Sequence, residues 1–283
     1  SGRTSGGPGG GLHVTRDGGD TWERLSGPDN QLGLPTKPVG KVAVAIAPSN
    51  TQRVYAMIET GDGIPWNGEP TEDGQVWGSE DGGRSWRLIT RDRNAMGRPH
   101  YYSRVVISPD DEDEAYFLTA SFTVSTDGGR TLDVTPRPEA PGGDHHDMWI
   151  DPTNADRMIV AHDQGLSISI NRGKTWFRQR LKNAQMYHVT VDNAIPYNVL
   201  GNKQDEPSYR GPSNSRILGG RRIDGIPRGM WHHVGGGESG WATPDPTDPN
   251  IIWSSASGSG MVGGIVVRYE EDRRQYRTVE VWP

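Results

Sequence analysis

The chain of 283 residues contains no cysteine. Disulfide frameworks, thiolate nucleophiles and cysteine-ligated zinc are therefore excluded, and cysteine usage gives no indication of the cellular compartment. No stretch approaches the roughly 18 consecutive apolar residues that a membrane-spanning helix requires. We expect no membrane span.

The sequence also lacks a continuous run of positive charge, because its 30 lysine and arginine residues are interspersed among 36 acidic ones. A phosphate backbone binds where a continuous positive field allows counterion release, and this sequence offers none. We therefore expect no nucleic-acid partner.

Glycine and proline are abundant, with 39 and 21 residues. They follow no triplet period, which excludes collagen and favours many turns between short strands. The chain begins at Ser1 with a glycine-rich leader over 1–10, and its last segment, 279–283, has the pattern of a strand. We expect a piece of a longer protein.

One short motif recurs four times along the chain. It reads TRDGGDTW at 15–22, SEDGGRSW at 79–86, STDGGRTL at 125–132 and SINRGKTW at 169–176. An Asp that binds its own following amides, a glycine with positive φ and an aromatic packed beneath them are typical of a hairpin turn. We assign no chemistry to Asp17, Asp81 and Asp127, and we place the motif tryptophans Trp22, Trp86 and Trp176 in the core between blades.

A second repeat, two strands joined at a proline turn, alternates with the first, as in VAVAIAP at 42–48. Together they predict an all-β fold, a β-propeller of four-stranded antiparallel blades. About five and a half blades are present, so the propeller is open or part of a larger one. The whole chain, 1–283, is interpreted as a single propeller. Its blades are predicted at approximately 11–25 (a half blade), 39–90, 100–136, 145–180, 186–234 and 238–282.

Several segments carry a resemblance to a known family, in combination with the repeated turns. They are GDHHDMWIDP at 143–152, AQMYH at 184–188 with GNKQD at 201–205, and GGGESG at 235–240. The chain resembles the bacterial Asp-box (BNR) repeat propellers of the sortilin-type group, which are similar to xyloglucanase-type glycoside hydrolases. The resemblance implies a secreted or periplasmic carbohydrate-active protein. The arginine signature of sialidases is not found, since Ile226-Pro-Arg228 runs in the wrong order.

In a propeller, the start of each first strand and the end of each second strand lie at the same rim. Polar residues gather at these positions. A glycosidase needs two carboxyl groups roughly 5–9.5 Å apart. The candidate catalytic residues are Asp147, Asp163, Asp205 and Glu238, with Asp147 and Asp163 as the first pair. The candidate substrate-binding residues are Tyr101, Tyr102, Arg104, His146, His162, Tyr187, His188 and Gln204, and Trp149 and Trp231 are further possible aromatic platforms.

Two other interpretations stay open for the rim histidines. His145, His146 and His162 with Asp147 and Asp163 have donor types that suit zinc or manganese. Alternatively, the histidines satisfy backbone groups in the channel. We assign no metal and no cofactor. The acidic run 110–114 is interpreted as a solvated turn.

The sequence therefore favours a glycoside hydrolase-like propeller that acts on extracellular polysaccharide through rim carboxylates. The alternative is a noncatalytic propeller that binds a glycan or peptide at the same rim. The expected partner is accordingly a polysaccharide or glycan, or else a protein or peptide.

Overall fold

The computed structural model describes residues 6, 9–60, 65–66, 69–70, 74–97, 99, 101–179, 184–214, 230–256 and 261–280, with 65–66 and 69–70 described by their backbone only. The chain divides into two compact units, residues 1–181 and 182–283. Within the described ranges the regular structure is strand, apart from one short 3-10 helix, Arg93–Ala95. No helix there is long and apolar enough to cross a membrane.

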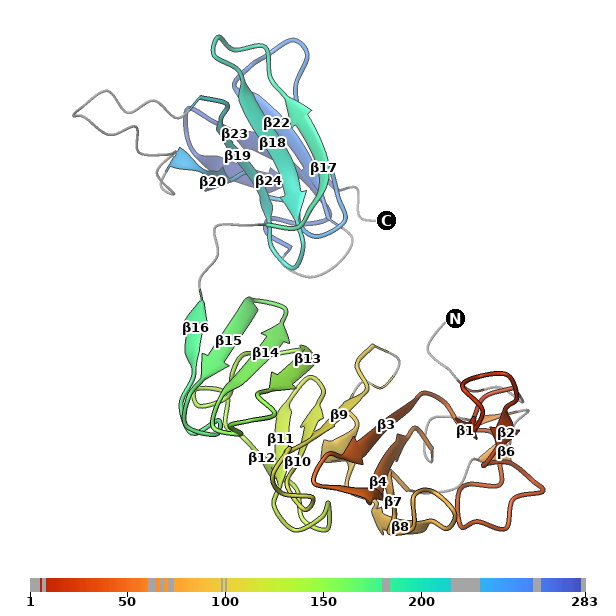
Figure 1. The fold of residues 1–283 in the computed structure, drawn as a ribbon. Coiled ribbons are helices and arrows are strands. Elements are labelled where there is room, and N and C mark those ends of the chain that lie inside the picture. The colour runs from red at the N-terminus through yellow and green to blue at the C-terminus, as the bar shows by residue number, and fades with distance from the viewer. Residues whose placement is uncertain are drawn as a thin grey trace. The chain divides into compact units, whose positions relative to one another are not determined.

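The first unit contains a two-stranded hairpin followed by three four-stranded antiparallel sheets (Figure 1). The hairpin pairs β1 (His13–Val14) with β2 (Glu23–Arg24). The first sheet is β3 (Val42–Ala47), β4 (Asn50–Ile58), β7 (Val76–Ser79) and β8 (Arg87–Thr90), with the small pair β5 (Pro65–Trp66) and β6 (Glu69–Pro70) between β4 and β7. The second is β9 (Arg104–Ile107), β10 (Ala115–Leu118), β11 (Phe122–Ser125) and β12 (Asp133–Val134). The third is β13 (His145–Ile150), β14 (Met158–His162), β15 (Gly165–Ser169) and β16 (Phe177–Gln179).

The second unit contains two more sheets of the same kind. One is β17 (Met186–Val191), β18 (Asn198–Lys203), β19 (Ser208–Pro212) and β20 (His232–His233). The other is β21 (Ala242–Pro244), β22 (Ile251–Ser255), β23 (Val266–Glu270) and β24 (Gln275–Thr278).

The strands of each four-stranded sheet follow one another in chain order, and neighbouring sheets meet through their first strands. Within the first unit β3 contacts β9 and β9 contacts β13, and within the second β17 contacts β21. Packing of antiparallel four-stranded sheets around their first strands is the blade arrangement of a propeller. The predicted fold class is confirmed. The treatment of all 283 residues as one propeller stays a prediction.

The core of the first unit lies between adjacent sheets. On β10, Phe117 packs with Tyr55 and Met57 of the preceding sheet, whereas Tyr116 packs with Met158 of the following one. Successive side chains of a strand point to opposite faces, so a strand between two neighbours is buried on both. All four residues of β10 are buried, which explains why its sequence shows no polar alternation.

The repeated motif forms the turn between the third and fourth strand of a blade. In the turn from β7 to β8, Asp81 Oδ1 accepts hydrogen bonds from the backbone amides of Arg84 and Ser85, both at 2.9 Å. The Ser79 hydroxyl accepts from the amide of Gly83 at 2.8 Å, and Gly82 and Gly83 have φ of 70° and 88°. The carboxylates of the motif thus accept hydrogen bonds from backbone amides of their own turns.

The motif tryptophans do not all lie in the core. Trp86 is buried in the first unit, and Trp176 packs at the edge of a core cluster. Trp22 is 62% exposed, so its predicted core position is wrong. Its indole still donates to the Gly19 carbonyl at 3.1 Å, but the β1–β2 sheet has only two strands and leaves the ring uncovered.

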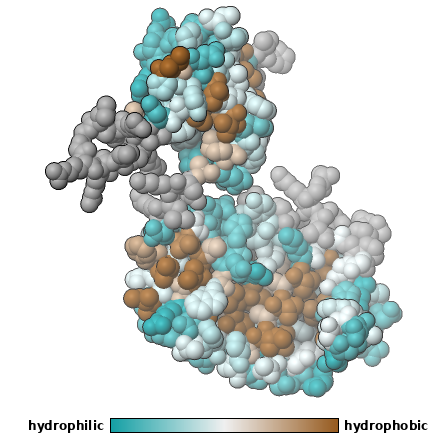
Figure 2. Space-filling model, turned by 45° about the horizontal axis from the view of Figure 1, so that its top comes forward, coloured by the Kyte–Doolittle hydropathy of each residue, from teal (hydrophilic) through white to brown (hydrophobic). Residues whose placement is uncertain are grey.

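Apolar side chains also remain on the surface (Figure 2). In the third sheet, one row of cross-strand partners joins Trp149 to Ile159, Ile159 to Ile168, and Ile168 to Phe177. Trp149, Ile159 and Phe177 are exposed. Trp149 therefore belongs to an apolar row across the sheet.

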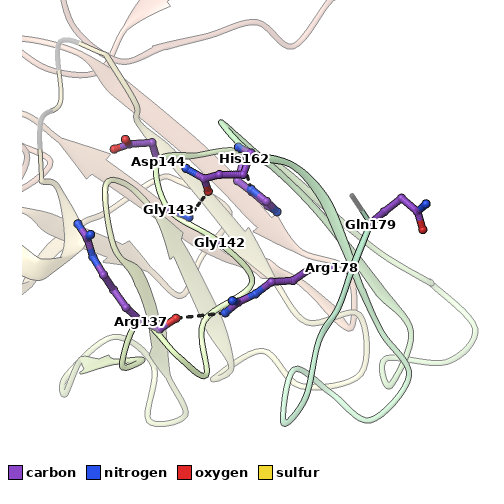
Figure 3. Close-up of a pocket in the computed structure, with 8 residues that line it drawn as sticks. Arg137, Gly142, Gly143, Asp144, His162, Arg178 and Gln179 are labelled. Carbon is purple, nitrogen blue, oxygen red and sulfur yellow. Dashed lines mark hydrogen bonds between the residues drawn. The ribbon is translucent and has the colours of Figure 1, made fainter. Parts of the chain in front are cut away.

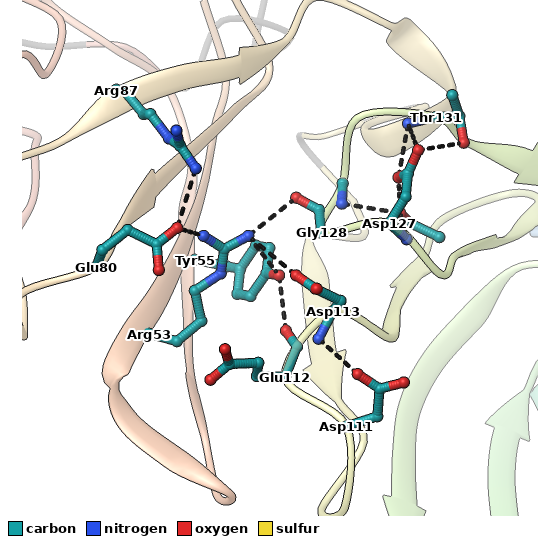
Figure 4. A network of polar contacts seen from close by, with 12 residues as sticks. Arg53, Tyr55, Glu80, Arg87, Asp111, Glu112, Asp113, Asp127, Gly128 and Thr131 are labelled. Atoms are coloured by element: carbon teal, nitrogen blue, oxygen red, sulfur yellow. Dashed lines mark hydrogen bonds and ion pairs between the residues drawn. The ribbon is translucent and has the colours of Figure 1, made fainter.

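Arginines from both neighbouring sheets hold the acidic run 110–114, which is therefore not simply a solvated turn. On one side, Arg53 donates to the Gly128 carbonyl at 3.3 Å and lies 3.6 Å from Asp113 (Figure 4). On the other side, Arg172 donates to Glu114 at 2.8 Å and to Asp110 at 2.6 Å and 3.0 Å. The pKa of Asp110 is lowered, chiefly because Arg172 donates to its carboxylate.

Arg172 makes these bonds from an unfavourable backbone conformation. Its φ is 59°, at a position where the other three turns have Gly18, Gly82 and Gly128. A left-handed conformation costs a residue with a side chain about 1–2 kcal/mol. The bonds to the neighbouring sheet offset this cost.

Arg172→Ala is expected to lower the free energy of unfolding by about 1–3 kcal/mol, because charge-assisted bonds to a nearly buried carboxylate are lost. Arg172→Gly loses the same bonds but relieves the backbone, so it should be about 1 kcal/mol more stable than Arg172→Ala. Urea denaturation of the two variants measures both effects. An Arg172→Ala protein as stable as the parent would show that the bonds of Arg172 to Glu114 and Asp110 do not stabilise the fold.

The turn aspartates predict a loss of stability in acid. Hydrogen bonds from Ser85, then from Ser79, hold the pKa of Asp81 well below its ordinary value. Stability from such a group is complete above the unfolded pKa, about 4, and is lost as the pH falls below it. Asp81→Asn should retain the turn, since Asn171 accepts from the Thr175 amide at 3.0 Å in the fourth copy.

We therefore expect a shallower decline of stability between about pH 4 and pH 2 in Asp81→Asn than in the parent. Thermal unfolding across this range provides the measurement. Asp20→Asn is the control, because it removes a charge from another of these turns at a side chain with no hydrogen bond in the described structure. Identical acid profiles for the parent and Asp81→Asn would disprove the assignment.

Candidate functional site

The candidate rim lies at the blade ends opposite the repeated turns. In the first unit, the start of β9, the start of β13 and the end of β14 reach it, whereas the turn between β15 and β16 lies at the other end. This follows from antiparallel pairing, in which the start of a first strand meets the end of a second.

Arg104 and Asp147 form a two-pronged ion pair between adjacent sheets. Arg104 Nε and Nη2 donate to the two oxygens of Asp147 at 3.2 Å and 2.8 Å. Asp147 Oδ1 also accepts from the amide of Met148 at 2.9 Å. Both charged side chains are more than half exposed, so the pair faces solvent and is accessible to a ligand.

His146 and Asp163 form a second pair on the same sheet. His146 Nε2 lies 2.6 Å from Asp163 Oδ1. The register of β13 shifts between His145 and Asp147, and such a bulge redirects side chains locally. His146 and Asp147 are consequently both exposed, while His145 and Met148 on either side are buried.

Two tyrosines stand beside this pair. Tyr101 and Tyr102 contact each other edge to face, with ring centroids 4.7 Å apart, and lie 6.0 Å and 5.2 Å from the His146 ring. Tyr101 is 56% exposed, whereas Tyr102 is buried. Only Tyr101 offers a ring face to a ligand, and Tyr102 supports it from below.

The other two histidines of this region are buried and neutral. His145 Nδ1 donates to the Thr119 carbonyl at 3.0 Å, and His162 contacts the Ser167 hydroxyl at 3.0 Å. Burial lowers the pKa of both. These contacts satisfy the Thr119 carbonyl and the Ser167 hydroxyl, whereas His145 Nε2 has no hydrogen-bond partner in the described structure. Among the residues that the structure describes, no group of three or more His, Cys, Asp or Glu could hold a metal ion.

In the second unit, one amide joins two of the predicted carboxylates. Gln204 Nε2 donates to Glu238 at 2.6 Å and to Asp205 at 3.1 Å. Tyr187 donates to Glu238 at 3.3 Å and contacts Gln204. These residues come from β17, the end of β18 and the loop before β21, so the blade ends bring them together as the repeat predicts.

His188 supports an aromatic surface that the sequence reasoning missed. Its ring stacks on Trp241 at 3.9 Å between centroids and 17° between planes, and its Nδ1 donates to the Gly240 carbonyl at 2.8 Å. Trp241 is 53% exposed. Its place directly before a first strand was the available signal. Trp231, a proposed platform, instead packs against Gly211, where a Cβ would lie 2.2 Å from its ring.

Strained backbone is concentrated in the rim segments. In the described chain, five residues other than glycine have positive φ, and Asp144, Asp205 and Ser239 are three of them. Residues in such conformations tend to cluster at functional sites. The strain therefore agrees with the side-chain arrangement in pointing to these loops.

The fold and the sites define β-propeller blades that carry polar loops at one blade end within each unit. No family model matches the chain, and no curated protein matches it. Solved structures with a similar fold include an ancestral GH74 enzyme, with 14% identity, a TM-score of 0.42, and coverage of 91% of this chain and 33% of that one. A GH74 xyloglucanase from Xanthomonas campestris has 14% identity and a TM-score of 0.42, with coverage of 97% and 42%.

A further similar structure is YCF48 bound to D1 peptide, with 14% identity, a TM-score of 0.37, and coverage of 94% of this chain and 74% of that one. This chain spans about a third to two fifths of the length of the two GH74 enzymes. At such identities the likeness concerns the fold alone.

The Arg104–Asp147 ion pair at the rim is expected to contribute little to stability. An exposed pair in water is worth at most about 1 kcal/mol, and the Arg104 and Asp147 side chains are 53% and 57% exposed. Arg104→Ala and Asp147→Ala should each change the free energy of unfolding by less than about 1 kcal/mol, in contrast to Arg172→Ala. Urea denaturation of the two variants measures this change. A loss of unfolding free energy above about 2 kcal/mol would show that this pair is structural.

Proposed function

We propose that the rim binds carbohydrate, as part of a secreted or periplasmic protein that acts on extracellular polysaccharide. The observation that supports this proposal is the exposed Tyr101 ring beside the Arg104–Asp147 ion pair and the hydrogen-bonded pair His146–Asp163. A sugar ring presents an apolar face to an aromatic ring and hydroxyls to charged groups. Binding sites commonly combine such rings with a few fixed polar groups.

The second unit supplies the same combination. Trp241 offers an exposed ring held by His188, and Glu238 and Asp205 are held by Gln204. The orienting hydrogen bonds reduce the ordering cost that a ligand would otherwise meet. Each unit thus has its own aromatic surface and its own fixed carboxylates.

Hydrolysis of a glycosidic bond is a second candidate function, favoured by one feature. Asp147 pairs with Ala161 of β14, and Asp163 directly follows the end of that strand, so both carboxylates belong to the same blade end. Inverting glycosidases hold their carboxyl groups roughly 6.5–9.5 Å apart. In this proposal Asp147 and Asp163 are the acid and base, and Arg104 and His146 orient them.

Noncatalytic binding is favoured over hydrolysis because donors already occupy the rim carboxylates. Asp147 accepts three hydrogen bonds, from Arg104 and the Met148 amide, and Asp163 contacts His146. Such pairs are ready to exchange bonds with hydroxyl groups. A peptide is the other ligand class that the test must separate, since a propeller of similar fold was solved with a bound peptide.

The test incubates the chain with xyloglucan, other β-glucans, xylan, pectin and sialylated glycans, and scores co-sedimentation and released reducing ends in the same tubes. We expect co-sedimentation with at least one glycan, weakened roughly tenfold by Tyr101→Ala because a stacking surface is lost. Asp133→Asn, an exposed change on the outer strand β12, is the control.

Reducing ends that disappear in both Asp147→Asn and Asp163→Asn would establish hydrolysis by that pair. Release that persists in both variants would refute their catalytic role. Absence of binding to every glycan, together with binding to a peptide library, would overturn the carbohydrate assignment.

A further inference from the structure

A cavity of about 440 Å³ lies beside the rim in the first unit (Figure 3). It is lined by Arg137, Gly142, Gly143, Asp144, His162, Gln164, Arg178 and Gln179. Pockets that hold small molecules are commonly about 300–1,000 Å³. The lining has two arginines and one carboxylate, so its charged groups are predominantly positive.

Arg178 is fixed in the cavity wall by the loop that precedes β13. Its Nη2 donates to the carbonyls of Arg137 and Pro138, both at 3.1 Å, and also to the carbonyl of Ala140. One guanidinium thus holds three carbonyls of the loop segment 137–140. Its structural task makes Arg178 unsuitable for a test by substitution.

The side chain of Arg137, unlike that of Arg178, is not held by any part of the chain that the structure describes. Its backbone carbonyl is held by Arg178, but its guanidinium makes no hydrogen bond or ion pair with any described residue. Figure 3 shows the Arg178 side chain reaching from β16 to the Arg137 carbonyl, while the Arg137 side chain extends from the loop itself. A guanidinium without a protein partner in a cavity wall is available to a ligand anion.

The glycine segment brings the backbone close to the opposite wall. A Cβ at Gly142 would lie 2.4 Å from the His162 ring, so this position requires glycine. The Gly143 amide donates to Gln164 Oε1 at 3.0 Å. That bond orients the side-chain amide of Gln164, whose nitrogen is a donor. The cavity therefore offers donors from both walls.

The cavity and the rim share the segment 142–144. The amide of Asp163 lies 3.4 Å from the Gly143 carbonyl and 3.2 Å from the Asp144 carbonyl, while its carboxylate contacts His146. The cavity wall and the rim therefore share one loop, in which Asp144 gives the cavity a hydrogen-bond acceptor.

We propose that this cavity takes the carboxylate of an acidic sugar residue, with Arg137 as its main partner and Gln164 as a second donor. The proposal rests on the carbohydrate-binding function proposed above and names the substrate class. Guanidinium groups recognise carboxylates through paired, charge-assisted hydrogen bonds, and the planar fork of arginine suits that geometry.

Isothermal titration tests the proposal with trigalacturonate and its methyl ester, which share their rings and differ in charge. 3′-Sialyllactose presents a carboxylate from a different sugar, and a neutral xyloglucan oligosaccharide reports on rim binding alone. We expect one of the acidic sugars to bind, with the acid of trigalacturonate about tenfold tighter than its ester if uronate is the source. Arg137→Gln should remove the preference for the charged ligand. Arg130→Gln, an exposed arginine in a repeated turn, should preserve it.

Equal affinity for acid and ester, with no binding of sialyllactose, would overturn the proposal. An equal effect of Arg137→Gln and Arg130→Gln would also overturn it, because the preference would then come from general charge. In either case, xyloglucan binding that Tyr101→Ala weakens would leave the proposed function standing. Loss of acid binding in Arg137→Gln with unchanged xyloglucan binding supports the proposal.

Discussion

The hydrogen bonds from an aspartate or asparagine to its own following amides are the constraint on which the rest of the structure depends. They close the turn between the third and fourth strands, and they do so with the same atoms at Asp81, Asp127 and Asn171. Because these turns finish the three four-stranded sheets of the first unit at one end, the loops at the opposite end are free to carry function. A carboxylate committed to a turn is also unavailable for chemistry.

Arginine performs different tasks at the two ends of the blades. At the turn end, Arg53 is buried and Arg172 is partly buried, and both join one sheet to the next through carboxylates and carbonyls. At the rim, Arg104 makes a similar bond to Asp147, but in solvent. Water weakens an exposed ion pair. Arg53 and Arg172 at the turn end therefore contribute to stability, whereas Arg104 is available to a ligand.

The fold was predictable because its determinants are local. The turn motif and the strand pattern repeat at short range, and both can be read from a single blade. The contacts of the candidate site depend on packing between blades, so the sequence predicted which residues reach the rim but not their partners, such as His146 with Asp163. The exposure of Trp22 and the arginine contacts of the acidic run 110–114 also depend on packing between sheets, and they were missed for the same reason. Trp241 was overlooked although its position directly before a first strand indicates the rim.

We propose that ligands bind at the rim and not at the turn end. Hydrogen–deuterium exchange with and without a saturating oligosaccharide tests this claim most directly, since both ends of the same blades are observed together. The account predicts slower exchange in 101–104 and 143–147, with no change in the turns at 79–86 and 125–131. Protection confined to those turns would contradict it.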